Sequence, residues 1–269
     1  MKTVYLCGDT LTGLFSALYD AWKAALAGRA CGIAVKGEVE LQLFCDYVEV
    51  EETERKAEAV IALIKKHLGT YAYQEISQAA LSYDPDKGEA ILGTMLAART
   101  IPDSRKIMDH LSHPKVEKVF ELSRQVGCEA HHLKGFLRFR ELAGGVLCAR
   151  IHPKSQVLPC LAPHFADRLP LENWMIWDET HNMFAVHEAS KQWVLVWGEA
   201  FEWEKLARVS DQEREFARLW TGFCKTIAID ARKNPRCQRQ NLPLRFRPEM
   251  TEFQEWDLES GCMFPEAGV

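Results

Sequence analysis

The dominant spacing of the hydrophobic residues changes from helical to alternating close to residue 130. Before that point apolar residues recur three or four apart, and from Lys134 onward they alternate with polar ones. The first pattern predicts a strand-helix lobe at 1–130, and the second predicts an antiparallel sheet, a helix and a basic tail at 131–247. An acidic tail follows at 248–269. We therefore expect an α+β fold.

No Gly/Ser-rich or Pro-rich linker marks the change of period, so we expect the N-terminal lobe to pack on the sheet. Thr10 stands where a helix N-cap belongs, between an apolar triplet at 4–6 and a helical stripe that runs over 11–26. Alternation then predicts a strand near 38–50. Further helices are expected at 57–68, ending at Gly69, at 86–99 and at 103–127, with Pro114 at a first helical position.

The second lobe shows signals for a hairpin, a meander and a long C-terminal helix. Gly144-Gly145 separates two alternating stretches, which predicts a hairpin of strands 135–142 and 146–152. Three strands separated by polar turns should then form an antiparallel meander, near 174–178, 183–187 and 193–197. The helix is expected at 211–230, and its apolar face consists of Phe216, Leu219, Trp220, Phe223, Cys224 and Ile227.

Composition excludes several classes of protein. No run of 18 apolar residues occurs in the 269-residue chain, and Asp9 interrupts its first apolar stretch, so we expect no membrane span, no signal peptide and a cytoplasmic location. The nine cysteines are odd in number and form no Cys-x-x-Cys, which is typical of reduced thiols. P-loop, Gly-x-Gly-x-x-Gly and Gly-x-Ser-x-Gly motifs are absent from the sequence, and we expect no cofactor and no metal.

Basic residues gather in two segments, although the net charge of the chain is −5. Residues 131–168 hold six Lys or Arg against two acids, and residues 232–247 hold six against none. Such segments are the electrostatic footprint of a polyanion-binding face, and DNA, single-stranded or duplex, is the partner we expect. Solvated surface without any ligand is the alternative.

The predicted hairpin places Arg138 and Arg140 on one face of its first strand, and Arg150 and His152 on one face of its second. A two-residue loop would mix charged and apolar faces, whereas a loop of three or five residues pairs Arg140 with Arg150. We expect the odd loop, and with it three arginines and a histidine that bind phosphates. The alternative is that acids neutralise the arginines, for example those of the Glu-rich segment 49–58.

A second candidate is a short helix that we expect at 163–168, with Pro163 at its first position. His164 and Arg168 are four residues apart and therefore neighbours on this helix. Histidine titrates near neutrality, so His164 is the candidate general acid or base, while Lys134 and Arg168 are candidate phosphate contacts. A structural hydrogen-bonding role for His164 is the alternative.

The basic tail combines arginine, lysine and amide side chains with two prolines, and we expect it to be irregular. Arginine neutralises phosphate and amides read base edges, so Arg232, Asn234, Gln238 and Arg245 are candidate nucleic-acid contacts. Tryptophans also stack on bases, although we expect most of them in the core. The chain has eight tryptophans, at positions 22, 174, 177, 193, 197, 203, 220 and 256.

Several stretches of the sequence are distinctive: HLKGFLRF at 132–139, LAPHFADR at 161–168, WMIWD at 174–178, and TIAI at 226–229 with the Arg232, Asn234-Pro235, Gln238, Pro243 and Arg245 that follow it. In these stretches the chain resembles a bacterial family of DNA metabolism or DNA repair proteins. The opening helix is also similar, with Cys7-Gly8-Asp9-Thr10 in place of the family's Tyr-Asp-Gly-Ser. Members are associated with a radical-SAM protein of DNA modification or repair, and a related domain is joined to uracil-DNA-glycosylase-like domains.

The resemblance implies a radical-SAM partner in the same pathway, and it carries no established catalytic residues. The chain lacks a radical-SAM three-cysteine motif, so an iron-sulfur cluster would belong to that partner. Three hypotheses follow from the residues and the resemblance. The first is that the chain is an accessory protein that binds nucleic acid through a basic face. The second is that it is an enzyme that acts on a DNA base or phosphodiester, with His164 as the acid or base. The third is that it is a scaffold that binds its partner without touching DNA.

Overall fold

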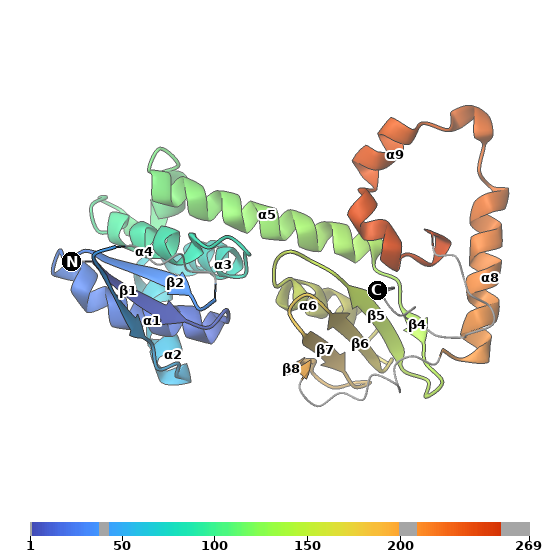
Figure 1. Ribbon diagram of the computed structural model, residues 1–269, viewed down its shortest axis with the longest axis horizontal. Helices are drawn as coiled ribbons and strands as arrows, with labels where there is room; N and C mark the ends of the chain where they lie inside the picture. The colour runs from blue at the N-terminus through green and yellow to red at the C-terminus, as the bar shows by residue number, and fades with distance from the viewer. Residues whose placement is uncertain (1, 38–42, 199–208, 254–269) are drawn as a thin grey trace. The chain divides into compact units, whose positions relative to one another are not determined.

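A computed structural model describes residues 2–37, 43–198 and 209–253 of the chain (Figure 1). Part of the strand predicted near 38–50 and most of the acidic tail predicted at 248–269 lie outside the described residues. No helix in the described ranges is long and apolar enough to cross a membrane.

The chain divides into two compact units, Met1–Cys128 and Glu129–Val269, and the division falls within a long helix, α5 (Pro114–Phe136). Helices and strands occur in both units, with a parallel sheet in the first and a mixed sheet in the second. The predicted α+β class is therefore confirmed. The expected packing of the N-terminal lobe on the sheet stays a prediction.

The first unit combines a three-stranded sheet with helices (Figure 1). Its elements before α5 are β1 (Lys2–Cys7), α1 (Leu11–Leu26), β2 (Cys31–Val35), β3 (Cys45–Glu49), α2 (Glu54–His67), α3 (Gly69–Ala80), α4 (Lys87–Ala97) and the 3-10 helix η1 (Ser104–Asp109). β1 lies between β2 and β3 and pairs in parallel with both. α1 lies against β1 and β2, and α2 packs on α1. Residues of α1, α2, α4 and α5, among them Leu18, Ile64, Ile91 and Leu122, form the core of this unit.

Local signals in the sequence explain where these helices begin and end. The Thr10 side chain caps α1 as predicted, by accepting a hydrogen bond from the Gly13 N–H at 2.8 Å. Pro114 is the first residue of α5, also as predicted. α2 ends before Gly69, whose φ of +89° suits glycine, but α3 starts at once at Gly69 and is a helix that the sequence analysis missed.

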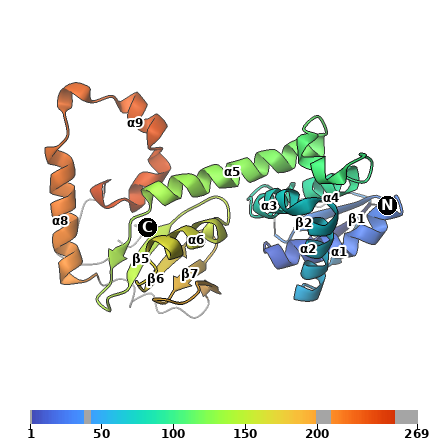
Figure 2. The same ribbon diagram turned by 180° about the vertical axis from the view of Figure 1, so that it is seen from behind.

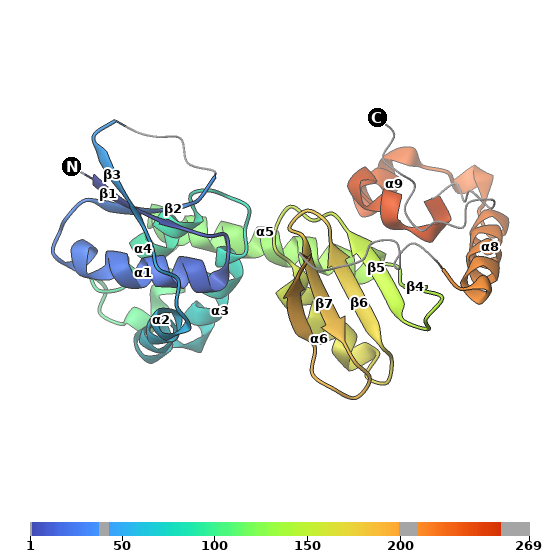
Figure 3. The ribbon, with the colours of Figure 1, turned by 60° about the horizontal axis from the view of Figure 1, so that its bottom comes forward.

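The second unit contains a five-stranded sheet in the order β4-β5-β6-β7-β8, and Figure 3 shows β4 to β7 side by side. Its strands and first helix are β4 (Arg140–Glu141), β5 (Leu147–Ile151), α6 (Leu158–Arg168), β6 (Trp174–Asp178), β7 (Met183–His187) and β8 (Val194–Trp197). The last three strands lie where they were predicted. After them come α8 (Asp211–Thr226), the 3-10 helix η3 (Asp230–Arg232), α9 (Pro235–Asn241), and the 3-10 helices η4 (Leu244–Glu249) and η5 (Thr251–Phe253).

The prediction of a purely antiparallel sheet is wrong at one pairing. β6 pairs antiparallel with β7, and β7 with β8, but β5 and β6 run parallel. A parallel pair needs a crossover connection of a dozen residues or more, and the chain between β5 and β6 supplies it as α6. α6 lies against β6 and β7, on one face of the sheet (Figure 2).

Two helix boundaries also differ from the prediction. α5 continues to Phe136, so residues 135–142 do not form a strand and β4 is only two residues long. Buried Ala130, Leu133 and Leu137 continue the helical spacing of α5, and this stripe outweighs the local alternation around the arginines. α6 starts at Leu158 rather than at 163.

The C-terminal part contains the predicted long helix, α8, and a second helix in the tail that was expected to be irregular (Figure 2). Asn234 caps α9, because its side-chain oxygen accepts a hydrogen bond from the Cys237 N–H at 3.1 Å. Pro235 follows in the first turn, where the helix needs no N–H donor. The proline therefore starts a helix here instead of preventing one.

Candidate nucleic-acid interface

The hairpin brings Arg140 and Arg150 to one sheet face, with a register that differs from the prediction. The Leu142 N–H donates to the Val146 carbonyl at 2.9 Å, which leaves a three-residue loop and confirms the odd loop. Arg140 nevertheless pairs with Cys148 and not with Arg150. The loop is centred one residue earlier than expected because its last residue, a glycine, adopts a positive φ and closes the turn. The shift of two residues keeps both arginines on the same face.

Arg138 precedes β4 and is held by a carboxylate of η5. Its Nη2 atom lies 2.9 Å from the Glu252 Oε1, and its Nη1 donates to the carbonyls of Gly135 and Leu137. Burial acts to raise the pKa of Glu252, but hydrogen bonds from Arg138, from its own backbone and from Trp220 outweigh burial and hold that pKa below its usual value. Glu252 is therefore an ionised partner of Arg138 near neutral pH.

Arg140 is 5% exposed and lies in the field of two glutamates. Burial lowers the pKa of its guanidinium, and the neighbouring Glu213 and Glu249 act against that shift. Glu213, at the start of α8, accepts a hydrogen bond from the Glu141 N–H at 3.2 Å, while burial raises the pKa of its carboxyl group. Such a buried arginine cannot reach a phosphate without rearrangement of the segment that covers it.

Arg150 and His152 share two carboxylates, one from the end of β6 and one from η4. Glu179 Oε2 lies 2.7 Å from Arg150 Nε and 2.6 Å from His152 Nε2. Glu249 Oε1 lies 3.2 Å from His152 Nδ1 and 3.6 Å from Arg150 Nε. The hydrogen bond with Glu249 is the main reason that the pKa of His152 is raised. The guanidinium of Arg150 also lies over the ring of Trp177, at 5.5 Å from its centroid.

Arg245 is paired as well, with the buried Glu129 on α5 at 3.2 Å. Glu129 also accepts hydrogen bonds from the backbone N–H groups of Lys154 and Ser155, each at 3.0 Å. The acids that meet the predicted arginines therefore come from the second unit itself and not from the Glu-rich segment 49–58. They fix the C-terminal 3-10 helices to α5 and the sheet.

The remaining predicted residues between 131 and 168 do not belong to the group of arginines and glutamates described above. Lys134 is exposed on α5, and Arg168 is exposed at the end of α6. His164 is half-buried, and its ring packs edge-on against Phe165 with a centroid distance of 5.0 Å. Within the described ranges none of these three side chains has an ion-pair partner.

Four cations of the C-terminal segment remain exposed: Arg232, Lys233, Arg236 and Arg239. Together they form what we call the cationic segment, which runs from η3 into α9. None of them has a carboxylate partner among the residues that the structure describes. This segment therefore differs from the hairpin, where glutamates neutralise the arginines.

The two predicted amide residues of the tail have different environments. Asn234 uses its side-chain oxygen to cap α9, which is a structural role. Gln238 lines a shallow cavity of about 400 Å³ beside the cationic segment, together with Ile229, Arg232 and Lys233. The side-chain oxygen of Asn234 is therefore already used by the helix, whereas Gln238 lines the cavity.

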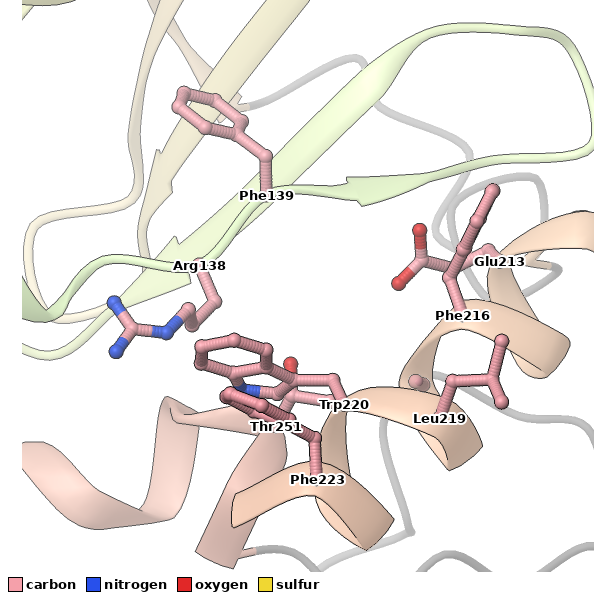
Figure 4. Close-up of a pocket in the computed structure, with 9 residues that line it drawn as sticks. Arg138, Phe139, Glu213, Phe216, Leu219, Trp220, Phe223 and Thr251 are labelled. Atoms are coloured by element: carbon pink, nitrogen blue, oxygen red, sulfur yellow. The ribbon is translucent and has the colours of Figure 1, made fainter. Parts of the chain in front are cut away.

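A larger pocket, of about 740 Å³, lies between α8, the two residues that precede β4, and η5 (Figure 4). Trp220 and Phe223 extend from α8 toward Thr251, and Phe139 lies across the pocket from them. The complete lining comprises Arg138, Phe139, Glu213, Phe216, Ala217, Leu219, Trp220, Phe223 and Thr251. The α8 face was predicted from sequence, whereas Thr251 and the nearby Glu252 were not, because they come from a segment with no periodic pattern.

A buried acid-histidine pair at the end of β6 was also missed. His181 Nδ1 lies 2.6 Å from Asp178 Oδ2, and the His181 N–H donates to the other carboxylate oxygen at 3.1 Å. Burial raises the pKa of Asp178, and the contacts with His181 oppose that shift. Asp178 ends a predicted strand, and the spacing of three residues to His181 was the available signal for the pair.

Comparison with known proteins identifies a family for this chain. The model of a protein family described as a domain of unknown function, DUF4130, matches residues 85–252. No match was found among the curated proteins. The matched range includes the hairpin, α8 and the cationic segment.

Proposed function

The chain belongs to this DUF4130 family, and we propose that it binds nucleic acid through the cationic segment of η3 and α9. Its resemblance to bacterial proteins of DNA metabolism and repair makes DNA the first polyanion to test. The same resemblance makes a radical-SAM protein the first partner to test. The role proposed for the chain is that of an accessory protein of DNA repair or modification.

The observation that carries the proposal is the contrast between two groups of cations in one unit. Glutamates 2.7 to 3.2 Å away neutralise Arg138, Arg150 and Arg245. The four cations of the cationic segment have no such partner in the described part of the chain. Exposed cations without carboxylates remain available to phosphate, and phosphate contacts supply most of the affinity of a protein for nucleic acid.

The local geometry of α9 suits a phosphate backbone. Arg236 and Arg239 are three residues apart on a helix and are therefore neighbours on its surface. Arg232 and Lys233 precede the Asn234 cap and extend the row of charge beyond the helix. Gln238 remains a candidate contact beside this segment, and Lys134 and Arg168 remain candidate contacts on α5 and α6.

The test is a salt titration of binding to a fluorescent single-stranded DNA, measured by anisotropy. A variant with Arg232, Lys233, Arg236 and Arg239 all changed to glutamine should bind more weakly, with a smaller slope of log affinity against log salt. Each lost phosphate contact lowers this slope by about 0.7 on a single strand, so four lower it by about 3.

A matched control removes four exposed cations from the first unit, by changing Arg55, Lys66, Lys106 and Arg124 to glutamine. Both variants change the net charge equally, so an unspecific effect of charge would alter both slopes alike. An unchanged slope in the cationic-segment variant would overturn the proposal. Absence of binding by the unmodified protein at low salt would do the same, and would favour a scaffold that co-purifies with a radical-SAM protein without touching DNA.

A further inference from the structure

The face of α8 that was predicted to be apolar is open to solvent. Phe216, Trp220 and Phe223 are 56%, 43% and 54% exposed, and Leu219 lies beside them. A cluster of large apolar side chains on the surface of a protein commonly marks a binding site. This face lines the 740 Å³ pocket, whose size suits a small molecule or a single nucleotide.

The aromatic side chains of the pocket are held in place before any ligand arrives. Trp220 Nε1 donates a hydrogen bond to Glu252 Oε2 at 3.2 Å, and the other oxygen of Glu252 binds Arg138. The ring of Phe223 stacks beside that of Trp220, with centroids 5.9 Å apart and planes inclined by 28°. A tryptophan fixed in this way loses little conformational freedom when a planar ligand stacks on it.

Polar groups stand at the edge of the same pocket (Figure 4). Glu213 and the Thr251 hydroxyl are side chains that can hydrogen-bond the edge of a nucleobase. Arg138 carries a positive charge at the rim, although Glu252 balances it. Aromatic rings for stacking together with a few hydrogen-bonding groups are the usual means by which proteins hold an unstacked base.

We propose that this pocket binds one unstacked base of a single-stranded nucleic acid, between the aromatic face of α8 and Phe139. The inference rests on the proposed function, because the cationic segment that follows α8 in the same unit would hold the phosphates of the same strand. Charge favours this occupant over an apolar helix of a protein partner, since the segment from Lys225 to Arg247 carries seven basic residues and one acid. Stacking would add affinity that depends on bases and not on phosphates.

The experiment compares two fluorescent strands of equal length, an oligothymidylate and an abasic strand with the same phosphates. The unmodified full chain should bind the oligothymidylate about 5- to 150-fold more tightly, the range expected for stacking of one base on an aromatic ring. Trp220→Leu and Phe223→Leu keep the apolar bulk but remove an aromatic face, and each should reduce this preference. Trp197→Leu, a change at an exposed tryptophan outside the pocket, should leave the preference intact.

The outcomes separate this inference from the proposed function. If neither strand binds, both proposals fail. If both strands bind equally and with a large salt slope, the cationic segment stands and the base pocket is refuted. A preference for thymidylate that survives both leucine variants, with unchanged circular dichroism spectra, would also refute the pocket. If the leucine variants leave the binding of both strands unchanged but abolish co-purification with the radical-SAM protein, the base pocket is refuted and the α8 face is a protein-docking site instead.

Discussion

Replacement of Glu249 by glutamine should destabilise the second unit in a manner that depends on pH. Glu249 connects η4 to the sheet through His152 Nδ1, at 3.2 Å, and lies 3.6 Å from Arg150 Nε. Its hydrogen bond is the main cause of the raised pKa of His152. Glutamine has nearly the same shape but no charge, so the change removes the stabilisation of the protonated imidazole and leaves Glu179 in place.

The sign of the effect follows from the direction of the shift. A histidine whose pKa is higher in the folded chain contributes stability that is fully present below its unfolded pKa of about 6.5, and that is lost as pH rises through the folded value. Hydrogen bonds to charged groups contribute about 1.5–3 kcal/mol when buried, and both side chains here are partly exposed. We expect Glu249→Gln to lower the free energy of unfolding by about 1 kcal/mol near pH 6, and by about half of that or less near pH 9.

Urea unfolding followed by tryptophan fluorescence measures this difference. Seven of the eight tryptophans lie beyond residue 128, so the signal reports mainly on the second unit. The control is Glu188→Gln, which breaks an exposed pair with Lys191 and should have a small effect that does not change with pH. A difference between wild type and Glu249→Gln that stays constant or grows from pH 6 to pH 9 would refute the reasoning.

Two further predictions concern packing and thiol chemistry. Gly88→Ala should lower the free energy of unfolding of the first unit by about 1–3 kcal/mol, because the added Cβ would lie 2.7 Å from Ile33 Cγ2. Gly144→Ala meets open space and should have little effect, and urea unfolding followed by far-UV circular dichroism, which reports on the helices of both units, measures both changes. Burial raises the pKa of Cys7 and of Cys148 to about 12, so both should resist iodoacetamide at pH 8 while the exposed Cys128 and Cys237 are alkylated, as peptide mass spectrometry would detect. Rapid alkylation of Cys148 in the folded chain would contradict its burial.

Capping and periodicity made much of the fold predictable from sequence. Thr10, Pro114 and the apolar stripe of α8 are local signals that act within a few residues, and the structure follows them. The antiparallel pairings of β6, β7 and β8 follow from short polar turns in the same way. The parallel pairing of β5 with β6 does not follow from a local signal, because it depends on how the 22-residue connection between the two strands packs. The length of that connection was the available signal.

The candidate site could be predicted only in part, because charge in a sequence does not reveal its partner. The sequence identified the arginines of the hairpin and the tail correctly as a concentration of positive charge. It could not show that Glu252, 114 residues along the chain from Arg138, and Glu249, 99 residues along the chain from Arg150, come back to neutralise these arginines. The apolar face of α8 was predicted correctly, but its exposure was not. Periodicity indicates which side chains share a face, but not whether another element covers it.

Hydrogen–deuterium exchange of the full chain, with and without a single-stranded oligonucleotide, tests the central claim most directly. α9 is a short, exposed helix whose amides should exchange fast in the free protein, so contact with a ligand will slow them measurably. The proposed function predicts new protection over residues 229–241 and little change over 140–152, where glutamates already hold the arginines. Protection confined to 140–152, or none anywhere in the second unit, would contradict it.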